Sequence, residues 1–312
     1  MTRQSSIDLA SPGRPFDNII NFRDVGRSVN EFIGKQILNE GILFRSARLD
    51  EASERDKRRL ADELHISTVI DLRSKTEHEM ATRKRRSENE PSSSGELSAP
   101  QPQSPVDARE HLLLVPGCQR ALISLTGKGF ERALLWKLDW YNYIKVITLA
   151  TTGYRDMAIK LVGEQVMRPR GLTGLAQDTL EASTAELRSV FELLASEQTY
   201  PVLVHCTQGK DRTGLVVLLM LLLVGETVSP AAIADDYTRS EPELVSEFDE
   251  RIREIRALGL DEEYTRCPPG FVEATTLYLD RRYGGVQRYL ASIGIDANMQ
   301  KRIRRKLIFG GM

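Results

Sequence analysis

Two side chains in the segment HCTQGKDRTG, His205 to Gly214, are of types that suit chemistry on phosphate. Cys206 carries a thiol, and a cysteine thiolate is a strong nucleophile. Arg212 follows six residues later and offers a planar pair of N–H donors that matches two oxygens of a tetrahedral anion. A sulfur nucleophile beside such a donor fits phosphoryl transfer, in which charge spreads over the equatorial oxygens of the transition state.

The flanking residues indicate how this segment is held. Residues 201–204, PVLV, have the apolar character of a short buried strand, and residues 215–224, LVVLLMLLLV, that of a buried helix. In parallel α/β sheets, ligands bind beyond the carboxyl ends of the strands, which is where this strand-to-helix loop would lie. Its N–H groups and the positive end of the helix would bind an anion and stabilise the Cys206 thiolate. Gly209 and Gly214 permit the tight turns that such a loop requires.

Residues of the loop also have structural interpretations. A buried cysteine is commonly a small apolar core residue, but the Arg212 and the helix that follow favour the nucleophile. For His205 we expect a structural role, in which it orients the loop and helps to hold the thiolate. Lys210 either adds positive charge beside the phosphate or points to solvent. The residues expected to surround a bound phosphate are Thr207, Gln208, Gly209, Lys210 and Thr213.

Apolar periodicity predicts the elements that position the loop. Residues 67–74, STVIDLRS, have the character of a buried strand, and residues 183–198 that of a helix whose capping box pairs Ser183 with Glu186. Further helices are expected over residues 241–259, 271–283 and 286–293. Strands separated by helical segments indicate an α/β fold, with a central, mostly parallel sheet flanked by helices and a helical C-terminal part.

Two segments differ from this pattern. Residues 82–110 are rich in Ser, Pro, Glu and Gln and lack apolar periodicity, so we expect a flexible insertion within a single domain spanning residues 1–312. The basic residues 83–86 at its start are interpreted as solvated charge rather than a partner site or localisation signal. Residues 128–157 combine helical runs with aromatic side chains, which usually belong to the core. These are Trp136, Trp140, Tyr141, Tyr143 and Tyr154.

A formal net charge of -1 over 312 residues excludes a general attraction to nucleic acid or membranes, so any anion binding must come from a local cluster. The dispersed Cys118, Cys206 and Cys267 argue against a disulfide framework and favour a reducing compartment. We expect a cytoplasmic protein, because the first residues lack an apolar signal core and residues 215–224 are too few to cross a bilayer. The histidines and cysteines show no ligand spacing, so neither a metal nor a cofactor is predicted.

The loop resembles the active-site loop of cysteine-dependent phosphatases. Its core, GKDRTG, is most similar to that of an atypical tyrosine-phosphatase family of bacteria and fungi that includes enzymes acting on phosphoproteins and on phosphoinositides. Three upstream segments are similar to the N-terminal pattern of this family in order and type: NFRDVG (21–26), LFRSARLD (43–50) and VIDLRSKTEHE (69–79). Two features depart from it, since Arg27 stands where a second glycine is frequent and the insertion follows Glu79.

The resemblance implies a two-step mechanism. Cys206 attacks phosphorus to give a cysteinyl-phosphate that water then hydrolyses, while Arg212 holds the transferring group. The Thr213 hydroxyl donates to the sulfur as it leaves. Asp211 is the first candidate for protonating the leaving group, and its alternative is a structural hydrogen bond in the loop or an ion pair with a neighbouring arginine. Other carboxylates that could serve are Asp24, Asp71, Asp139 and Asp156.

The upstream segments carry arginines that lie either at the mouth of the site or in surface salt bridges, and we expect a structural role for most of them. These are Arg23, Arg45, Arg48 and Arg73, with Asp24, Asp50, Asp71 or Glu77 as partners. The residues expected to support the loop are His205, Gly214, Asp24 and Arg45. The resemblance also implies that part of residues 128–165 forms a helical lid over the active site.

The sequence therefore predicts a cysteine-dependent phosphatase that acts on phosphotyrosine in proteins, with phosphoserine, phosphothreonine or phosphoinositides as further substrates. Two alternatives stay open. One is a dedicated phosphoinositide phosphatase, and the other is a non-catalytic module that only binds phosphate. The module is disfavoured because binding alone needs the N–H groups of the loop but no nucleophile.

Overall fold

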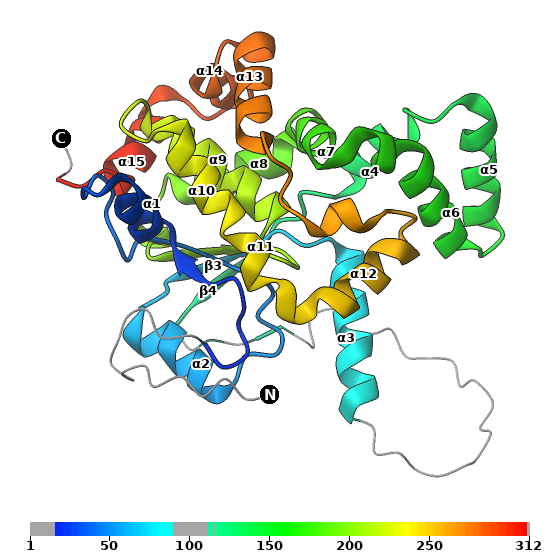
Figure 1. The fold of residues 1–312 in the computed structure, drawn as a ribbon, viewed down its shortest axis with the longest axis horizontal. Coiled ribbons are helices and arrows are strands. Elements are labelled where there is room, and N and C mark those ends of the chain that lie inside the picture. Colours follow the sequence, from blue (N-terminus) through cyan, green and yellow to red (C-terminus); the bar gives the residue numbers. More distant parts are fainter. Residues whose placement is uncertain (1–15, 90–111, 114, 116, 311–312) are drawn as a thin grey trace.

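A five-stranded sheet with the order β1-β2-β5-β3-β4 lies at the centre of the protein (Figure 1). The computed structural model describes residues 16–89, 112–113, 115 and 117–310. β1 is antiparallel to β2, and the other neighbouring strands are parallel. The strands are β1 (Arg23–Asp24), β2 (Leu43–Ser46), β3 (Thr68–Asp71), β4 (Gln119–Leu122) and β5 (Val202–His205). The mostly parallel α/β fold expected from the sequence is confirmed.

Helices account for most of the chain between and after the strands. Those before β5 are α1 (Val25–Ile33), α2 (Glu54–Arg58), α3 (Lys75–Asn89), α4 (Lys128–Leu135), α5 (Trp140–Thr151), α6 (Arg155–Val162), α7 (Arg168–Ala182) and α8 (Thr184–Leu194). Those after β5 are α9 (Asp211–Val224), α10 (Pro230–Thr238), α11 (Ser240–Glu243), α12 (Phe248–Ala257), α13 (Phe271–Tyr283), α14 (Val286–Ser292) and α15 (Ala297–Leu307). Short helical turns are η1 (Arg59–Glu63), η2 (Gly163–Met167), η3 (Glu197–Thr199), η4 (Val245–Glu247) and η5 (Glu262–Thr265). No helix in the described ranges has the length and apolarity needed to cross a membrane.

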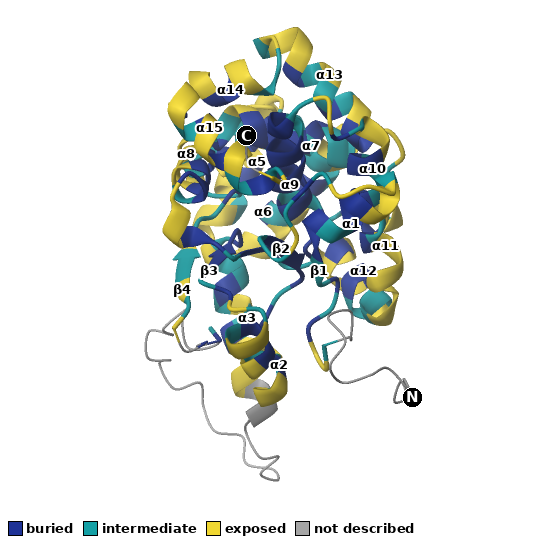
Figure 2. Cartoon of the chain, turned by 90° about the vertical axis from the view of Figure 1, so that its left-hand side faces the viewer, coloured by how far each residue is buried: buried dark blue, intermediate teal, exposed yellow. Residues whose placement is uncertain are grey.

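The two faces of the sheet are covered unequally. Along β5, Val202 and Val204 pack into a large core formed with α1, α7 to α10 and α13 to α15, while Leu203 packs into a smaller core with η1 and the neighbouring strands β2 and β3. Side chains alternate between the faces of a strand, so one short apolar strand contributes to both cores. Figure 2 shows buried residues concentrated along α9. An uninterrupted apolar sequence is what a helix enclosed on nearly all sides requires.

The sequence predicted the strands β3 and β5 and the helices α13 and α14 closely. α9 begins at Asp211, earlier than the apolar run suggested, because the second half of the loop already forms its first turn. The capping box at Ser183 is wrong, since its hydroxyl donates to the carbonyl of Leu125 at 2.7 Å and does not cap α8. The helix expected over residues 241–259 is divided into α11, η4 and α12.

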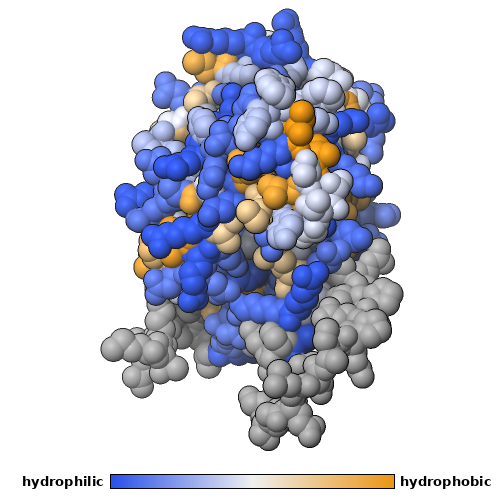
Figure 3. All heavy atoms as spheres, turned by 90° about the vertical axis from the view of Figure 1, so that its right-hand side faces the viewer, coloured by the Kyte–Doolittle hydropathy of each residue, from blue (hydrophilic) through white to orange (hydrophobic). Residues whose placement is uncertain are grey.

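The two exceptional segments also differ from expectation. α3 continues to Asn89, so the start of the expected insertion at residue 82 is wrong, and residues 90–111 lie outside the described ranges. The five aromatic residues singled out between residues 128 and 157 are not core, since Trp136 is 74% exposed and Trp140 76%. Figure 3 shows apolar and weakly polar side chains gathered on this face. A helical lid within residues 128–165 and a single domain over the whole chain stay predictions.

Candidate active site

The loop at residues 206–210 joins β5 to α9 at the carboxyl end of the middle strand of the sheet. Gly209 adopts a φ of +66°, and a Cβ atom there would lie 2.0 Å from the carbonyl oxygen of Ser46 at the end of β2. Both the backbone conformation and the close approach exclude a side chain. The loop therefore keeps its shape only with glycine at this position.

The sulfur of Cys206 lies inside this loop. The residue is 2% exposed, and the N–H of Gly209 donates to Sγ at 3.2 Å. The N–H aimed at the sulfur and the N-terminus of α9 place positive partial charge at the same end of the loop. Thr213, expected to donate to the same sulfur, is buried, and its hydroxyl has no hydrogen-bond partner among the described residues. It is therefore not committed to another acceptor there.

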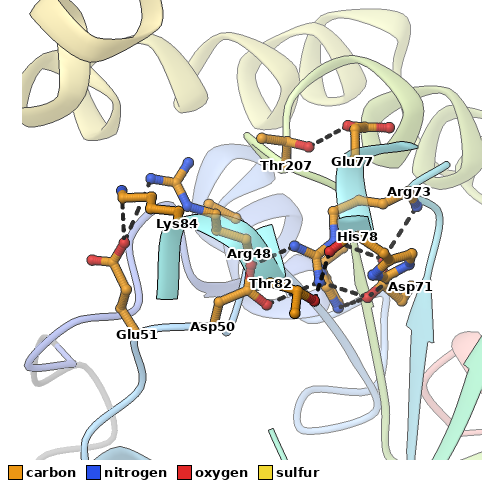
Figure 4. A network of polar contacts seen from close by, with 12 residues as sticks. Arg48, Asp50, Glu51, Asp71, Arg73, Glu77, His78, Thr82, Lys84 and Thr207 are labelled. Carbon is orange, nitrogen blue, oxygen red and sulfur yellow. Dashed lines mark hydrogen bonds and ion pairs between the residues drawn. The ribbon is translucent and has the colours of Figure 1, made fainter. Parts of the chain in front are cut away.

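Arg212 is held by a carboxylate from a different element. Its two terminal nitrogens each donate to one oxygen of Glu77, in the first turns of α3, at 2.6 Å. The Thr207 hydroxyl of the loop donates to the same carboxylate (Figure 4). Burial alone would raise the pKa of Glu77, but the Arg212 guanidinium lowers it to about 2. Glu77 is thus ionised at neutral pH and fixes the orientation of the guanidinium over the loop.

His205 contacts the loop from below and is fully buried. Its Nδ1 lies 3.2 Å from the carbonyl oxygen of Cys206, and its Nε2 lies 3.4 Å from Oδ2 of Asp71. Burial lowers the pKa of His205 to about 4, although the charge of Asp71 acts in the opposite direction. The imidazole is therefore neutral at pH 7. The expected role of His205 in orienting the loop stays a prediction, for which the contact with the Cys206 carbonyl provides the geometry.

Arg45 supports the loop from β2. Its guanidinium donates to the carbonyls of Gly209 at 2.8 Å and of Lys210 at 3.3 Å, and pairs with Asp236 of α10 at 2.5 Å. Arg23 binds the same carboxylate at 2.9 Å. Asp236, buried between two guanidiniums, has its pKa lowered, because their charges outweigh the effect of burial. One carboxylate of α10 therefore fixes both arginines beneath the loop.

The other upstream residues are distributed around the base of the site. Arg48 pairs with Glu247 at 3.1 Å, and Arg73 lies between Asp71 and Asp50 (Figure 4). Arg73 thus has two of the partners expected for it, but for Arg45 and Arg73 a location at the surface is wrong, since they are 0% and 2% exposed. The structural role expected for these arginines is what their buried contacts provide.

Asp24 does not contact the loop as the sequence predicted. It caps α1, where its carboxylate accepts from the N–H of Arg27 at 3.3 Å, and it also accepts from the N–H of Gly41. Burial raises the pKa of Asp24, although these N–H groups act against the rise. Asp24 therefore stabilises the β1–α1 corner. Gly214 does lie against a supporting residue, since a Cβ there would come within 3.5 Å of the Arg45 guanidinium.

Lys210 neither points to solvent nor is free to contact a phosphate. Its side chain is 0% exposed, and its ammonium donates to the carbonyls of Tyr264 at 3.0 Å and Arg266 at 2.6 Å, in and after η5. It also lies 3.4 Å from the carboxylate of Asp211. The ammonium thus ties the loop to η5.

Asp211 is the first residue of α9, and its side chain is 35% exposed. The Tyr237 hydroxyl donates to it at 3.4 Å. A carboxyl group at the rim of the loop, in contact with solvent, has access to a departing oxygen. The alternative carboxylates are engaged elsewhere: Asp71 is paired with Arg73 at 2.9 Å, and Asp139 caps α5. Asp156 lies in the first turn of α6.

Four contacts were not expected. Glu77 was considered only as a partner of the upstream arginines, whereas it holds Arg212. Asp236 and the carbonyls of η5 were not considered at all. Asn21 binds the carbonyl of Gln208 at 2.8 Å through its amide, so the NFRDVG segment contacts the loop directly. The capping pattern Ser74-x-x-Glu77 was a signal for Glu77, since Ser74 donates to the same carboxylate through its N–H.

A buried cysteine in a strand-to-helix loop, with an arginine held over it by a carboxylate, is the arrangement that the resemblance to cysteine-dependent phosphatases implies. The chain belongs to the tyrosine phosphatase family, whose family model matches residues 14–309. It is 33% identical over 135 residues to a tyrosine-protein phosphatase of Nostoc commune, covering 40% of this chain and 45% of that protein. It is also 33% identical over 145 residues to the triple specificity protein phosphatase PtpB of Mycobacterium tuberculosis, covering 42% of this chain and 51% of PtpB. The matches thus span about half the length of these relatives, and the family predicted from the sequence is confirmed.

Proposed function

We propose that this protein hydrolyses phosphate monoesters through a cysteinyl-phosphate, with phosphotyrosine in proteins as its main substrate. The observation that supports this most strongly is the ion pair of Arg212 and Glu77 over the loop that encloses Cys206. A module that only binds phosphate needs neither the buried sulfur nor a carboxylate that orients the guanidinium. Both are needed where charge must be stabilised along a reaction path.

In the first step the Cys206 thiolate attacks phosphorus, the S–P bond forms, and the ester P–O bond breaks. The N–H groups of the loop and the Arg212 guanidinium bind the equatorial oxygens as charge accumulates on them. The bonding electrons leave with the alcohol or phenol oxygen, which takes a proton from Asp211. In the second step water attacks phosphorus, releases inorganic phosphate and returns the electron pair to sulfur.

Asp211 is proposed as the proton donor because its partly exposed carboxyl group lies at the rim of the loop. The neighbouring Tyr237 hydroxyl and Lys210 ammonium fix the orientation of the carboxylate. In the second step the same carboxylate would accept a proton from the attacking water. The Thr213 hydroxyl would donate to sulfur as the S–P bond breaks.

The range of substrates is proposed to be wide. One relative is named a triple specificity phosphatase. By analogy, phosphoserine, phosphothreonine and phosphoinositides are proposed as further substrates of this chain. The preference among these substrates depends on the depth of the phosphate site below the protein surface. In a deep pocket only the phosphate of a phenyl ester, as in phosphotyrosine, reaches the loop.

The decisive experiment measures phosphate release by the wild type and by Cys206→Ser in the presence of a metal chelator. The substrates are a phosphotyrosine peptide, a phosphoserine peptide and a soluble phosphoinositide. Turnover by the wild type alone is expected, with vanadate acting as an inhibitor of the wild type. Equal turnover by Cys206→Ser would refute the cysteine mechanism, and binding of vanadate without any turnover would favour the phosphate-binding module.

A further inference from the structure

A pair of helices projects from the body of the protein and carries exposed apolar side chains on its surface. α5 and α6 stand at the edge of the molecule, beyond α4 and α7 (Figure 1). Exposed fractions range from 36% for Tyr143 to 76% for Trp140. We call α5 and α6 the hairpin, and the exposed apolar side chains on it and next to it the hairpin face. They are Trp136, Trp140, Tyr141, Tyr143, Ile144, Ile147, Tyr154 and Met157.

Folding does not account for the hairpin face. α5 has one buried residue, Val146, and α6 has one, Ala158, so the two helices pack on each other along a narrow seam. The remaining apolar residues of α5 make a surface of their own, seen in Figure 3 as orange and pale atoms among blue ones. A contiguous exposed apolar patch of this kind marks an interaction site.

The composition of the hairpin face indicates what it binds. The chain has two tryptophans, and both lie in this face, 74% and 76% exposed. Tryptophan and tyrosine combine an apolar ring with a polar atom, which suits the headgroup region of a lipid bilayer. Ile144 and Ile147, both on α5, add aliphatic groups of the type that enters the acyl region of a bilayer.

The charges around the hairpin face complement an anionic surface. The chain as a whole has a formal net charge of -1, but exposed basic residues outnumber exposed acidic ones around these helices. The exposed basic residues are Lys128, Arg132, Lys137, Lys145, Arg155 and Lys160. The exposed acidic residues are Glu131, Asp139 and Asp156. Basic residues that flank an apolar face add attraction to anionic lipid headgroups.

We propose that the hairpin face docks the protein on an anionic lipid bilayer, with its aromatic rings in the headgroup region. The docking itself does not depend on catalysis. Its consequence does rest on the proposed function, because a docked phosphatase would meet phosphorylated lipid headgroups, or phosphoproteins held at the same surface. This explains how a chain with almost no net charge could select a charged membrane.

The base of the hairpin is connected to the catalytic loop. At Gly163, which follows α6, a Cβ atom would lie 1.7 Å from the carbonyl oxygen of Leu258, so the backbones touch there. The Tyr264 hydroxyl of η5 donates to the carbonyl of Met167 at the end of η2. The carbonyl of Tyr264 in turn binds the Lys210 ammonium. The docking surface and the loop thus share one support, and docking fixes the position of the site relative to the bilayer.

The two tryptophans provide the test, because their fluorescence reports on this face alone. The full chain is mixed with vesicles of phosphatidylcholine, or of phosphatidylcholine with phosphatidylserine, and vesicle flotation is measured in parallel. A blue shift of the emission and flotation with the anionic vesicles are expected. No shift and no flotation with the anionic vesicles would overturn the proposal.

Two variants examine the apolar and the charged contribution while keeping both tryptophans. Ile144→Ser with Ile147→Ser is expected to lower partitioning into anionic vesicles at least about tenfold. Leu277→Ser with Phe309→Ser, two residues exposed elsewhere, is the matched control and is expected to leave partitioning unchanged.

Lys145→Glu with Arg155→Glu is expected to lower partitioning by about fivefold or more per residue. The matched control is Lys301→Glu with Arg304→Glu on the basic helix α15. Equal losses in hairpin and control variants would refute docking through this face.

Other occupants of the hairpin face give distinct results without lipid. A blue shift that increases with protein concentration would show a second copy of the chain on this face, and a blue shift on adding vanadate would show closure over the active site. Either result, with no response to anionic vesicles, overturns the proposal.

Turnover of a soluble aryl phosphate is measured separately. Its absence with intact vesicle binding would refute the proposed function alone, and turnover without vesicle binding would refute docking alone.

Discussion

The contact between Glu77 and Arg212 makes the most direct prediction about activity. Glu77→Gln keeps the size of the side chain but replaces one carboxylate oxygen by an N–H₂ group. That group faces a guanidinium nitrogen that previously donated at 2.6 Å, so two donors oppose each other. The guanidinium loses a charge-assisted pair of hydrogen bonds and leaves the orientation in which it binds equatorial oxygens.

The size of the effect follows from the burial of the pair. Removing one partner of a buried ion pair costs about 3–5 kcal/mol. The side chains of Arg212 and Glu77 are 19% and 28% exposed, so water screens part of the interaction. We therefore expect about 2–3 kcal/mol, which corresponds to a loss of about 30- to 150-fold in kcat/KM.

The assay compares kcat and KM of wild type, Glu77→Gln and Glu77→Asp on an aryl phosphate, with vanadate affinity measured in parallel. Glu79→Gln is the matched control, because Glu79 lies on the same helix and forms an ion pair with Lys75 at 3.6 Å. Glu77→Asp keeps the charge and is expected to recover part of the activity. Equal kcat/KM in Glu77→Gln and Glu79→Gln, with both proteins folded, would refute the assignment of Glu77 as the positioning residue of Arg212.

Three further predictions concern the loop. Gly209→Ala is expected to lower turnover at least about 100-fold, because a Cβ would lie 2.0 Å from the carbonyl of Ser46; turnover within tenfold of wild type would contradict this. Lys210→Met leaves the carbonyls of Tyr264 and Arg266 without their buried donor. Calorimetry should therefore show a free energy of unfolding that is lower by about 2–3 kcal/mol, and an unchanged melting temperature would contradict the contact. The pKa of His205 is about 4 when folded and about 6.5 when unfolded. The unfolded chain therefore binds the proton first, so stability should fall by roughly 1.4 kcal/mol per unit as the pH drops from about 6.5 to about 4. Denaturant titrations should show a weaker fall in His205→Asn, and identical pH profiles would contradict the assignment.

The parts of the site that the sequence predicted are those encoded locally. The strand β5, the loop and the helix α9 follow each other within one segment, so residue types alone indicated that Cys206 and Arg212 would share an anion site. Periodicity likewise predicted β3 and the helices α8, α13 and α14. Both are set by short-range backbone geometry and by the burial of adjacent apolar residues.

The contacts that the sequence did not predict depend on tertiary structure. Arg212 finds its partner in Glu77, which is distant in the chain, and periodicity says nothing about such a pair. Ser183 had a good capping pattern, but a buried carbonyl of Leu125 offered its hydroxyl a better acceptor. The aromatic residues of α5 were interpreted as core because such stripes usually are, and only the packing shows that no second layer covers them in the described structure.

The distribution of the supports for the loop has a consequence for synthesis of the chain. Cys206 and Arg212 are translated before Asp236, which holds Arg45 beneath the loop, and before Tyr264 and Arg266, which bind Lys210. A nascent chain on the ribosome therefore contains the nucleophile before it contains the groups that shape its pocket. The proposed hydrolytic activity can arise only after this later segment has emerged and docked. Truncated products that end before it should be catalytically silent.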